Sequence, residues 1–279
     1  MNMKQILTSI CALAVSACAM FAQDVNAATD LYNNGATALS TGDNAGALSY
    51  FQKSHAEAVK CGEAGKEIKA NCESVIPQLM VRVAKDNVKA GKFDAAVAKL
   101  VEAKDVATKF GNAEEAKEAT AMIPQVYMQK GNTLLKSKNA DGAIAAYKKV
   151  IEMNPSNGKA YLNMGQAYES IDNDAKAEEA YKAAAAKGQA KSANKKLSKI
   201  YLTKASKLNV DGKYAEALAM ALKSNTYAES ANAYYIAGRA CQNSGKKADA
   251  VKYYNKYLEL SPAAANANDV RKVIAELQK

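Results

Sequence analysis

The sequence predicts an all-α protein built from successive helix-turn-helix units. Among its 279 residues alanine is abundant, proline occurs only four times, and runs of Val, Ile and Thr are scarce. This composition favours helix over strand throughout the chain. Apolar and small residues also recur at separations of three and four, which places them on one face of a helix. Length in such a chain sets the number of repeated units and not the number of separate cores.

The clearest unit lies between Pro124 and Tyr168. It contains two helical patterns separated by a break at 139–142, and the Asn-Pro step at 154–155 cannot continue the second helix. Gly131 removes a side chain from the first helix at a point where another helix must pass close. The residues at three- and four-residue spacing are Tyr127, Gly131 and Leu134 on the first helix, and Ala143, Tyr147 and Val150 on the second.

An aromatic residue, Gly, Leu, Ala, Tyr and Pro in this order resembles the tetratricopeptide repeat (TPR), with Tyr127 in place of the usual Trp. The resemblance implies a right-handed superhelical solenoid of about six TPR-like repeats. A C-terminal capping helix is expected over 264–277, with Val270 and Ile274 on its apolar face. The equivalent register positions of the six repeats are Gly35, Ala84, Gly131, Gly165, Ala205 and Gly238.

The distances between these register positions divide the chain. By subtraction they are 49, 47, 34, 40 and 33 residues, against a TPR period of about 34. The first two are too long, and each insert precedes an Ile-Pro-Gln step, so we expect lengthened helices bent near Pro77 and Pro124. The predicted parts are a signal peptide over 1–22, two enlarged repeats over 23–123, four regular repeats over 124–262 and the capping helix over 263–279.

The N-terminal segment predicts export. After Lys4 there is no charge until Asp24, and the residues between are small or apolar, as in a secretory signal. Cleavage is expected after Ala19 or after Ala22, which gives an exported, periplasmic protein. Two alternatives are a retained membrane anchor and a lipoprotein, because 15–18 resembles a lipobox in which Cys18 would carry the lipid. No other apolar segment is long enough to span a membrane.

The remaining cysteines do not indicate a metal site. Cys61 and Cys72 form a disulfide if the segment between them folds the chain back on itself; otherwise they are two reduced helix residues. Cys241 is expected to be a small buried side chain at a packing position. Because no Cys/His cluster has zinc spacing and His55 is the only histidine, we predict no metal and no cofactor.

The sequence does not indicate catalysis. It contains no Gly-x-Ser-x-Gly elbow, no Gly-rich phosphate loop and no His-Glu-x-x-His helix. His55 is placed on the second helix of the first repeat, where a surface or interface role is expected. We therefore predict a protein that is not an enzyme.

The positive charge is concentrated in the last third of the chain. From Lys187 onward lie 17 of the 38 Lys and Arg but only 7 of the 28 Asp and Glu, so the net charge of +10 arises there. In a continuous helix Lys187, Lys191, Lys195 and Lys199 would form a basic stripe. The stripe is either a solvated face or a contact for an acidic protein or anionic lipid. Nucleic acid is disfavoured, since no aromatic residues interleave with the lysines.

In TPR proteins the first helices of successive repeats line a concave groove that receives a partner peptide or helix. Tyr147, Tyr181 and Tyr254 fall instead on packing positions and are expected in the core. The resemblance thus predicts a non-catalytic scaffold of the cell envelope that binds a protein or peptide; the alternative is a membrane-associated assembly or transport factor. Carried over position by position, the groove residues are Gln125, Met128, Asn132, Lys136, Leu162, Gln166, Glu169, Lys199, Leu202, Ser206, Tyr235, Arg239 and Gln242.

Overall fold

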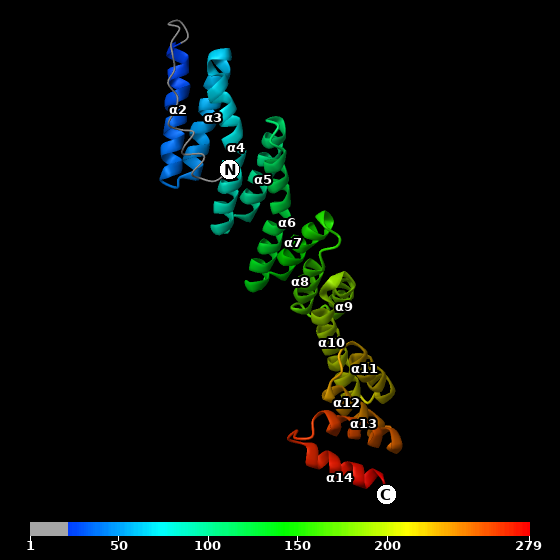
Figure 1. Cartoon of the computed structure of the whole chain (residues 1–279). Helices are drawn as coiled ribbons and strands as arrows, with labels where there is room; N and C mark the ends of the chain where they lie inside the picture. The colour runs from blue at the N-terminus through cyan, green and yellow to red at the C-terminus, as the bar shows by residue number, and fades with distance from the viewer. Residues whose placement is uncertain (1–21) are drawn as a thin grey trace. The chain divides into compact units, whose positions relative to one another are not determined.

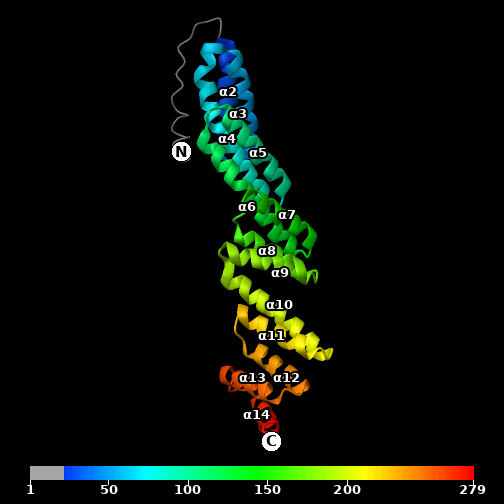
Figure 2. The ribbon, with the colours of Figure 1, turned by 90° about the vertical axis from the view of Figure 1, so that its right-hand side faces the viewer.

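The structure, a computed structural model, describes residues 22–279. The predicted signal peptide, apart from its last residue, and the candidate lipidation site Cys18 lie outside the described residues. Over the described range the chain consists of helices joined by short turns, without a β-strand, as Figures 1 and 2 show. The all-α prediction is confirmed. The described residues divide into two compact units, one that ends at Lys130 and one that comprises Gly131–Lys279.

The first unit is a series of helices that each pack against the next. In order they are α2 (Ala22–Ser40), α3 (Asn44–Lys60), the 3-10 helix η1 (Gly62–Gly65), α4 (Lys66–Lys89), α5 (Phe93–Lys109) and most of α6 (Ala113–Lys136). α2 packs on α3, α3 on α4 and α4 on α5. Phe51, Leu79, Met80 and Leu100 are fully buried between them.

Two helices, α4 and α6, are longer than the others of this unit. Each has 24 residues and contains one of the prolines, Pro77 or Pro124, in its interior. The inserts at 62–75 and 112–122 therefore lengthen the first helices of the repeats, as the sequence predicted. The expected bend at the two prolines stays a prediction.

The second unit repeats a shorter helix pair. After the end of α6 it contains α7 (Ala140–Met153), α8 (Gly158–Glu169), α9 (Asp174–Ala184), α10 (Ala190–Val210), α11 (Tyr214–Tyr227), α12 (Ala231–Asn243), α13 (Lys247–Leu260) and α14 (Ala267–Leu277). The first break lies before Ala140 and not over the predicted 139–142, because Asn139 caps α7 by accepting a hydrogen bond from the Gly142 amide. α8 packs on α9, α10 on α11 and α12 on α13.

The predicted capping helix is α14. It packs on α13 and buries Val270 and Ile274 against an apolar cluster that includes Tyr254 and Tyr257. It begins at Ala267, three residues later than the sequence indicated, because Ala264 and its neighbours form a turn after Pro262. Cys241 lies in the same cluster with no exposed surface, as its packing position predicted.

The register position of each repeat is matched to the residue that faces it from the second helix. A glycine stands where the second helix presents an aromatic ring, and an alanine where it presents a smaller side chain. A Cβ atom on Gly131, Gly165 or Gly238 would lie 2.5 to 2.7 Å from the facing tyrosine ring. The six pairs are Gly35 with Phe51, Ala84 with Leu100, Gly131 with Tyr147, Gly165 with Tyr181, Ala205 with Ala221, and Gly238 with Tyr254.

The helix is not continuous across the four lysines of the basic stripe, so the condition under which Lys187 would share a face with the other three is not met. Gly188 has a φ of 86° and Lys187 has φ −113° and ψ 36°, which separates α9 from α10. The carbonyl of Lys187 packs against Gly158 at the start of α8, where a Cβ atom would approach it to 2.2 Å. The extra segment at 185–189 accounts for the long interval between Gly165 and Ala205.

Of the two alternatives for Cys61 and Cys72, a disulfide or two reduced residues, the structure has the second. Cys72 is a buried free thiol in α4, so it forms no disulfide with Cys61. The Sγ of Cys61 donates instead to the backbone carbonyl of Glu57, four residues earlier. Burial raises the pKa of the Cys72 thiol to about 11, so the thiol stays protonated near neutral pH.

Candidate partner-binding surface of the second unit

The residues predicted to line a groove lie on the first helices of the repeats. Gln125 and Met128 belong to the first unit, and the others belong to the second. By helix they are Gln125, Met128, Asn132 and Lys136 on α6; Leu162, Gln166 and Glu169 on α8; Lys199, Leu202 and Ser206 on α10; and Tyr235, Arg239 and Gln242 on α12.

Three of these polar residues are held in place by the core tyrosines. Tyr147, Tyr181 and Tyr254 are buried, as predicted, but each hydroxyl group reaches a residue on the first helix. The bonds run from Tyr147 to Asn132 (2.8 Å), from Tyr181 to Glu169 (2.7 Å) and from Tyr254 to Gln242 (2.5 Å). Glu169 and Gln242 occupy the same position of their repeats, four residues after the register glycine, whereas Asn132 lies one residue after Gly131. Each of the three supplies the acceptor for a buried phenol.

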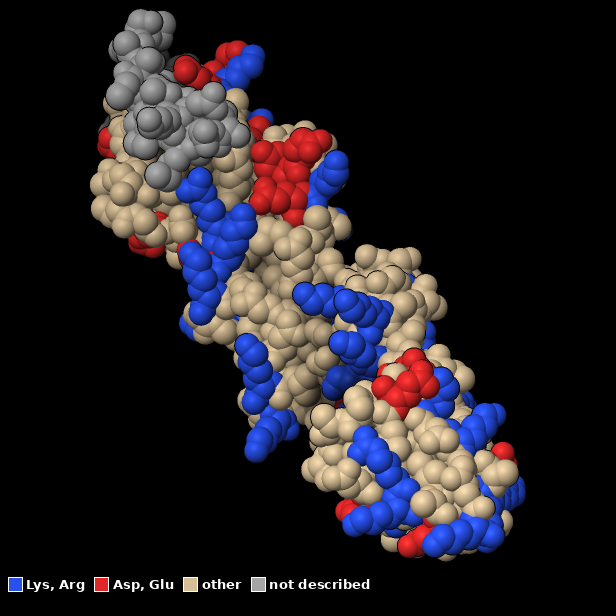
Figure 3. Space-filling view, turned by 60° about the horizontal axis from the view of Figure 1, so that its bottom comes forward, with Lys and Arg blue, Asp and Glu red and all other residues tan. Residues whose placement is uncertain are grey.

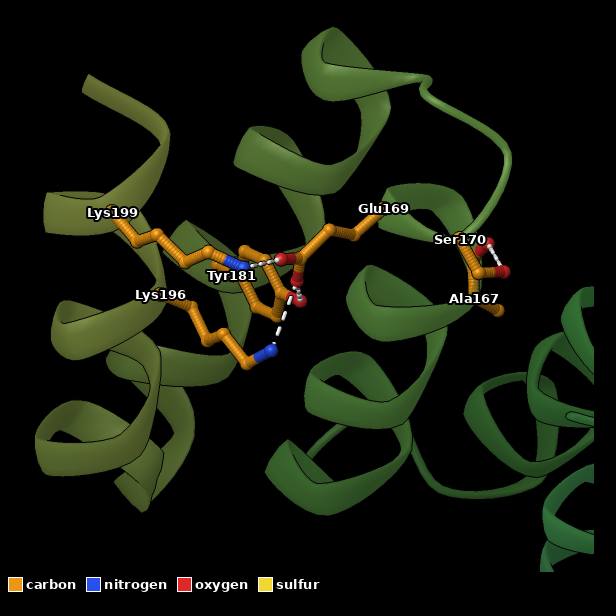
Figure 4. Close-up of polar contacts among 6 residues, drawn as sticks. All are labelled: Ala167, Glu169, Ser170, Tyr181, Lys196 and Lys199. Atoms are coloured by element: carbon orange, nitrogen blue, oxygen red, sulfur yellow. Dashed lines mark hydrogen bonds and ion pairs between the residues drawn. The ribbon is translucent and has the colours of Figure 1, made fainter. Parts of the chain in front are cut away.

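Glu169 is the most strongly tied of the three (Figure 4). One carboxylate oxygen accepts hydrogen bonds from the Tyr181 hydroxyl and from Lys196 Nζ (3.0 Å), and the other accepts from Lys199 Nζ (3.0 Å). Partial burial raises the pKa of Glu169, but the bonds from Tyr181, Lys196 and Lys199 outweigh it and lower the pKa to about 2. This part of the predicted groove is therefore an internal ion cluster joining α8, α9 and α10.

A cavity lies between α10 and α12, and four predicted groove residues line it together. These are Leu202, Ser206, Tyr235 and Arg239, and the cavity volume is about 640 Å³. The ring of Tyr235 packs against Tyr257, with 5.2 Å between ring centroids. The structure thus brings four of the six groove residues predicted on α10 and α12 to one site; Lys199 and Gln242 are not part of it.

The larger apolar side chains of the lining, Leu202, Tyr235 and Ile236, are half-buried, whereas its two cations are exposed. No Asp or Glu is among the described residues that line it, and Lys207 and Arg239 form no ion pair within 22–279. Sequence reasoning missed five lining residues, which are Thr203, Lys207, Val210, Asn232 and Ile236. Val210 could have been predicted from the sequence, since it follows Leu202 and Ser206 at four-residue spacing. In the structure it is 82% exposed.

The remaining groove candidates lie outside this cavity. Leu162 and Gln166 are half-buried on α8, and Lys136 is exposed in the last turn of α6. Of the predicted basic stripe, Lys191, Lys195 and Lys199 share α10, while Lys187 lies in the break before it. Over the face seen in Figure 3, Lys and Arg side chains form several strips and acidic side chains form smaller patches.

The one histidine makes structural contacts. His55 Nε2 lies 3.1 Å from Glu73 Oε1, and the imidazole ring packs against Phe110. Within residues 22–279 no group of three or more His, Cys, Asp or Glu side chains is placed to hold a metal ion. None of the helices in that range is both long and apolar enough to cross a membrane.

Helix pairs that repeat along the chain, with a cavity between successive first helices, define an α-helical repeat protein. Tetratricopeptide repeat family models match residues 128–192 and 231–263, so these two parts of the chain carry tetratricopeptide repeats. These residues include the third, fourth and sixth predicted repeats, where the sequence signature is strongest. Such repeats form scaffolds for protein–protein interaction.

The solved structures that this chain matches share little sequence with it. The MamA protein is 20% identical over 67% of this chain and 92% of its own, with a TM-score of 0.37. YrrB, a TPR protein with an unusual peptide-binding site, is 17% identical over 74% and 96%, also with a TM-score of 0.37. A TPR protein from Parabacteroides merdae is 15% identical over 91% and 100%, with a TM-score of 0.27. A comparison with curated proteins finds no match.

Proposed function

We propose that the protein is an exported, non-catalytic scaffold that binds a peptide or helix of an envelope protein in the cavity between α10 and α12. The observation that carries this proposal is the cavity itself, whose apolar side chains and unpaired cations are open to a partner. Four of its lining residues were expected at the partner groove from their register positions alone.

The lining residues would contact a partner in two ways. Leu202, Tyr235 and Ile236 offer apolar surface to a side chain of the partner. Arg239 and Lys207 have their charge available for a carboxylate or for backbone carbonyls of an extended segment. An interface with an apolar centre and a polar rim is the usual arrangement for specific binding.

A photo-crosslinking amino acid at Ser206 tests the groove. Ser206 is exposed and lines the cavity, so we expect it to form an adduct with an envelope protein in intact cells. Arg239→Glu should reduce that adduct by about five-fold or more, because it reverses one of the two exposed charges of the lining. The matched control is Ala219, which is exposed on α11 outside the cavity. Equal adducts at Ser206 and Ala219, or no effect of Arg239→Glu, would count against the groove.

Export is supported by the N-terminal sequence and is tested separately. The mature protein should begin after Ala19 or at Gln23, which N-terminal sequencing of the protein from cell envelopes will show. The alternative is a membrane-associated assembly or transport factor held by a lipid on Cys18. In that case a palmitate analogue would label the wild type and not Cys18→Ser. A full-length protein with an intact N-terminus in the cytosol contradicts both versions.

A further inference from the structure

We propose that a second cavity, bordered by α7, α8 and α9, binds an acidic segment of another protein, with an apolar or aromatic side chain between carboxylates. Its volume is about 410 Å³ and it shares no lining residue with the cavity between α10 and α12. The proposal therefore does not rest on the groove function. The lining residues are Lys148 on α7, then Tyr161, Met164 and Tyr168 on α8, then Lys176, Glu179, Ala180 and Ala183 on α9.

The floor of this cavity is made by one face of α8. Tyr161, Met164 and Tyr168 follow each other at three- and four-residue spacing, and the first two remain half-exposed. The facing residues of α9 are Ala180 and Ala183, whose side chains are too short to cover them. A polarisable thioether beside two aromatic rings is left open, which suits an apolar or aromatic guest.

The rim carries cations that the protein does not neutralise. Lys176 Nζ lies 5.6 Å from the centre of the Tyr168 ring, and Lys187 Nζ lies 5.5 Å from that of Tyr161. Neither these two nor Lys148 forms an ion pair with any residue in 22–279. Glu179 is the only acidic residue of the lining, so the site has an excess of positive charge.

Other lysines of the second unit, by contrast, do form ion pairs. Lys196 and Lys199 pair with Glu169, and Lys182 and Lys204 pair with Glu178. The lysines that join α8, α9 and α10 are therefore neutralised by glutamates of the protein. The lysines at the cavity are not, and they can pair with carboxylates of a partner. Unpaired cations beside aromatic rings favour carboxylates, while the rings favour an apolar body.

A segment of an acidic protein supplies both the carboxylates for the lysines and the apolar side chain for the aromatic rings. A phosphate headgroup would reach the lysines but would leave the Tyr161 and Met164 surfaces uncovered. We expect a side chain the size of Leu or Phe to occupy the apolar surface of α8, with carboxylates before and after it bound by Lys148 and Lys176. The volume lies within the ordinary range for sites that hold small groups.

The test uses a fluorescently labelled pentapeptide with a central phenylalanine between two pairs of acidic residues, and fluorescence anisotropy with the full chain. We expect saturable binding that weakens about ten-fold or more when Lys148→Glu and Lys176→Glu are combined. Ala183→Met fills the cavity without changing charge or helix propensity, and should weaken binding by a similar factor. The matched control, Lys92→Glu with Lys117→Glu, reverses two exposed lysines of the first unit and should change affinity less than about two-fold.

Other outcomes overturn the proposal. They are the absence of saturable binding, an equal loss in the control pair, or undiminished binding after Ala183→Met in a protein that melts like the wild type. A pentapeptide with alanine in the central position should bind about ten-fold more weakly, because the floor is then unfilled. If the lysine variants abolish binding to phosphatidylglycerol vesicles but not to the peptide, the surface recognises lipid and the inference is wrong.

Discussion

Replacing Gly165 with Ala is expected to lower the free energy of unfolding by about 2 kcal/mol. The new Cβ atom would lie 2.6 Å from Cε1 of Tyr181, a residue with no exposed surface. The ring cannot easily move away, because its hydroxyl group is bonded to Glu169. Overpacking costs of up to about 3 kcal/mol then exceed the gain of about 1 kcal/mol that alanine has over glycine in a helix.

A double-mutant cycle identifies the cause. The repeats that carry Ala84 and Ala205 at this position present Leu100 and Ala221 in place of a tyrosine. Tyr181→Leu should therefore relieve the clash, so that the double variant is more stable than the sum of the single effects by about 1 kcal/mol or more. Chemical denaturation followed by circular dichroism measures all four proteins. Additive effects within about 0.5 kcal/mol would show that the ring is not the obstacle.

The helix pairs were predictable because local pattern and packing agree along most of the chain. The contact between the two helices of a repeat is visible in the sequence as a small residue at the register position and an aromatic residue on the second helix, as in Gly165 and Tyr181. The break at Lys187 was not predicted, because alanine and lysine favour helix on both sides and Gly188 was the one local residue that permits a break. It is set by a tertiary contact, in which the Lys187 carbonyl meets Gly158.

The candidate site was likewise predictable only in part. Register positions placed Leu202, Ser206, Tyr235 and Arg239 at one cavity, because equivalent positions of repeats face the same way. They did not show that Glu169 is already engaged by two lysines, since such pairing depends on the distance between α8 and α10. The sequence thus indicates some of the residues that share a cavity, but it does not indicate which of their charges are already paired.

Loss of stability in acid is expected to centre on Glu169 and Glu178. Glu178 resembles Glu169: partial burial raises its pKa, but bonds from Lys182, Tyr201 and Lys204 lower it to about 2. Both values lie below the 4.5 of an unperturbed glutamate, so the folded state binds these protons less readily than the unfolded chain. Their stabilisation is complete above pH 4.5 and is lost as the pH falls toward 2, by about 2 kcal/mol for each group.

Glu169→Gln separates this effect from the general acid sensitivity of the protein. The amide imitates the protonated carboxyl group and can still accept the Tyr181 hydrogen bond, but it leaves Lys196 and Lys199 without their counterion. We expect the variant to be about 2 kcal/mol less stable than the wild type at pH 7, and the two stability curves to converge near pH 2. Glu259→Gln is the control, because Glu259 is 63% exposed and, among residues 22–279, forms an ion pair with Lys256 alone. It should change stability by less than about 0.5 kcal/mol. A constant difference between Glu169→Gln and the wild type from pH 7 to pH 2 would mean that Glu169 stabilises the helices by packing and not by its charge.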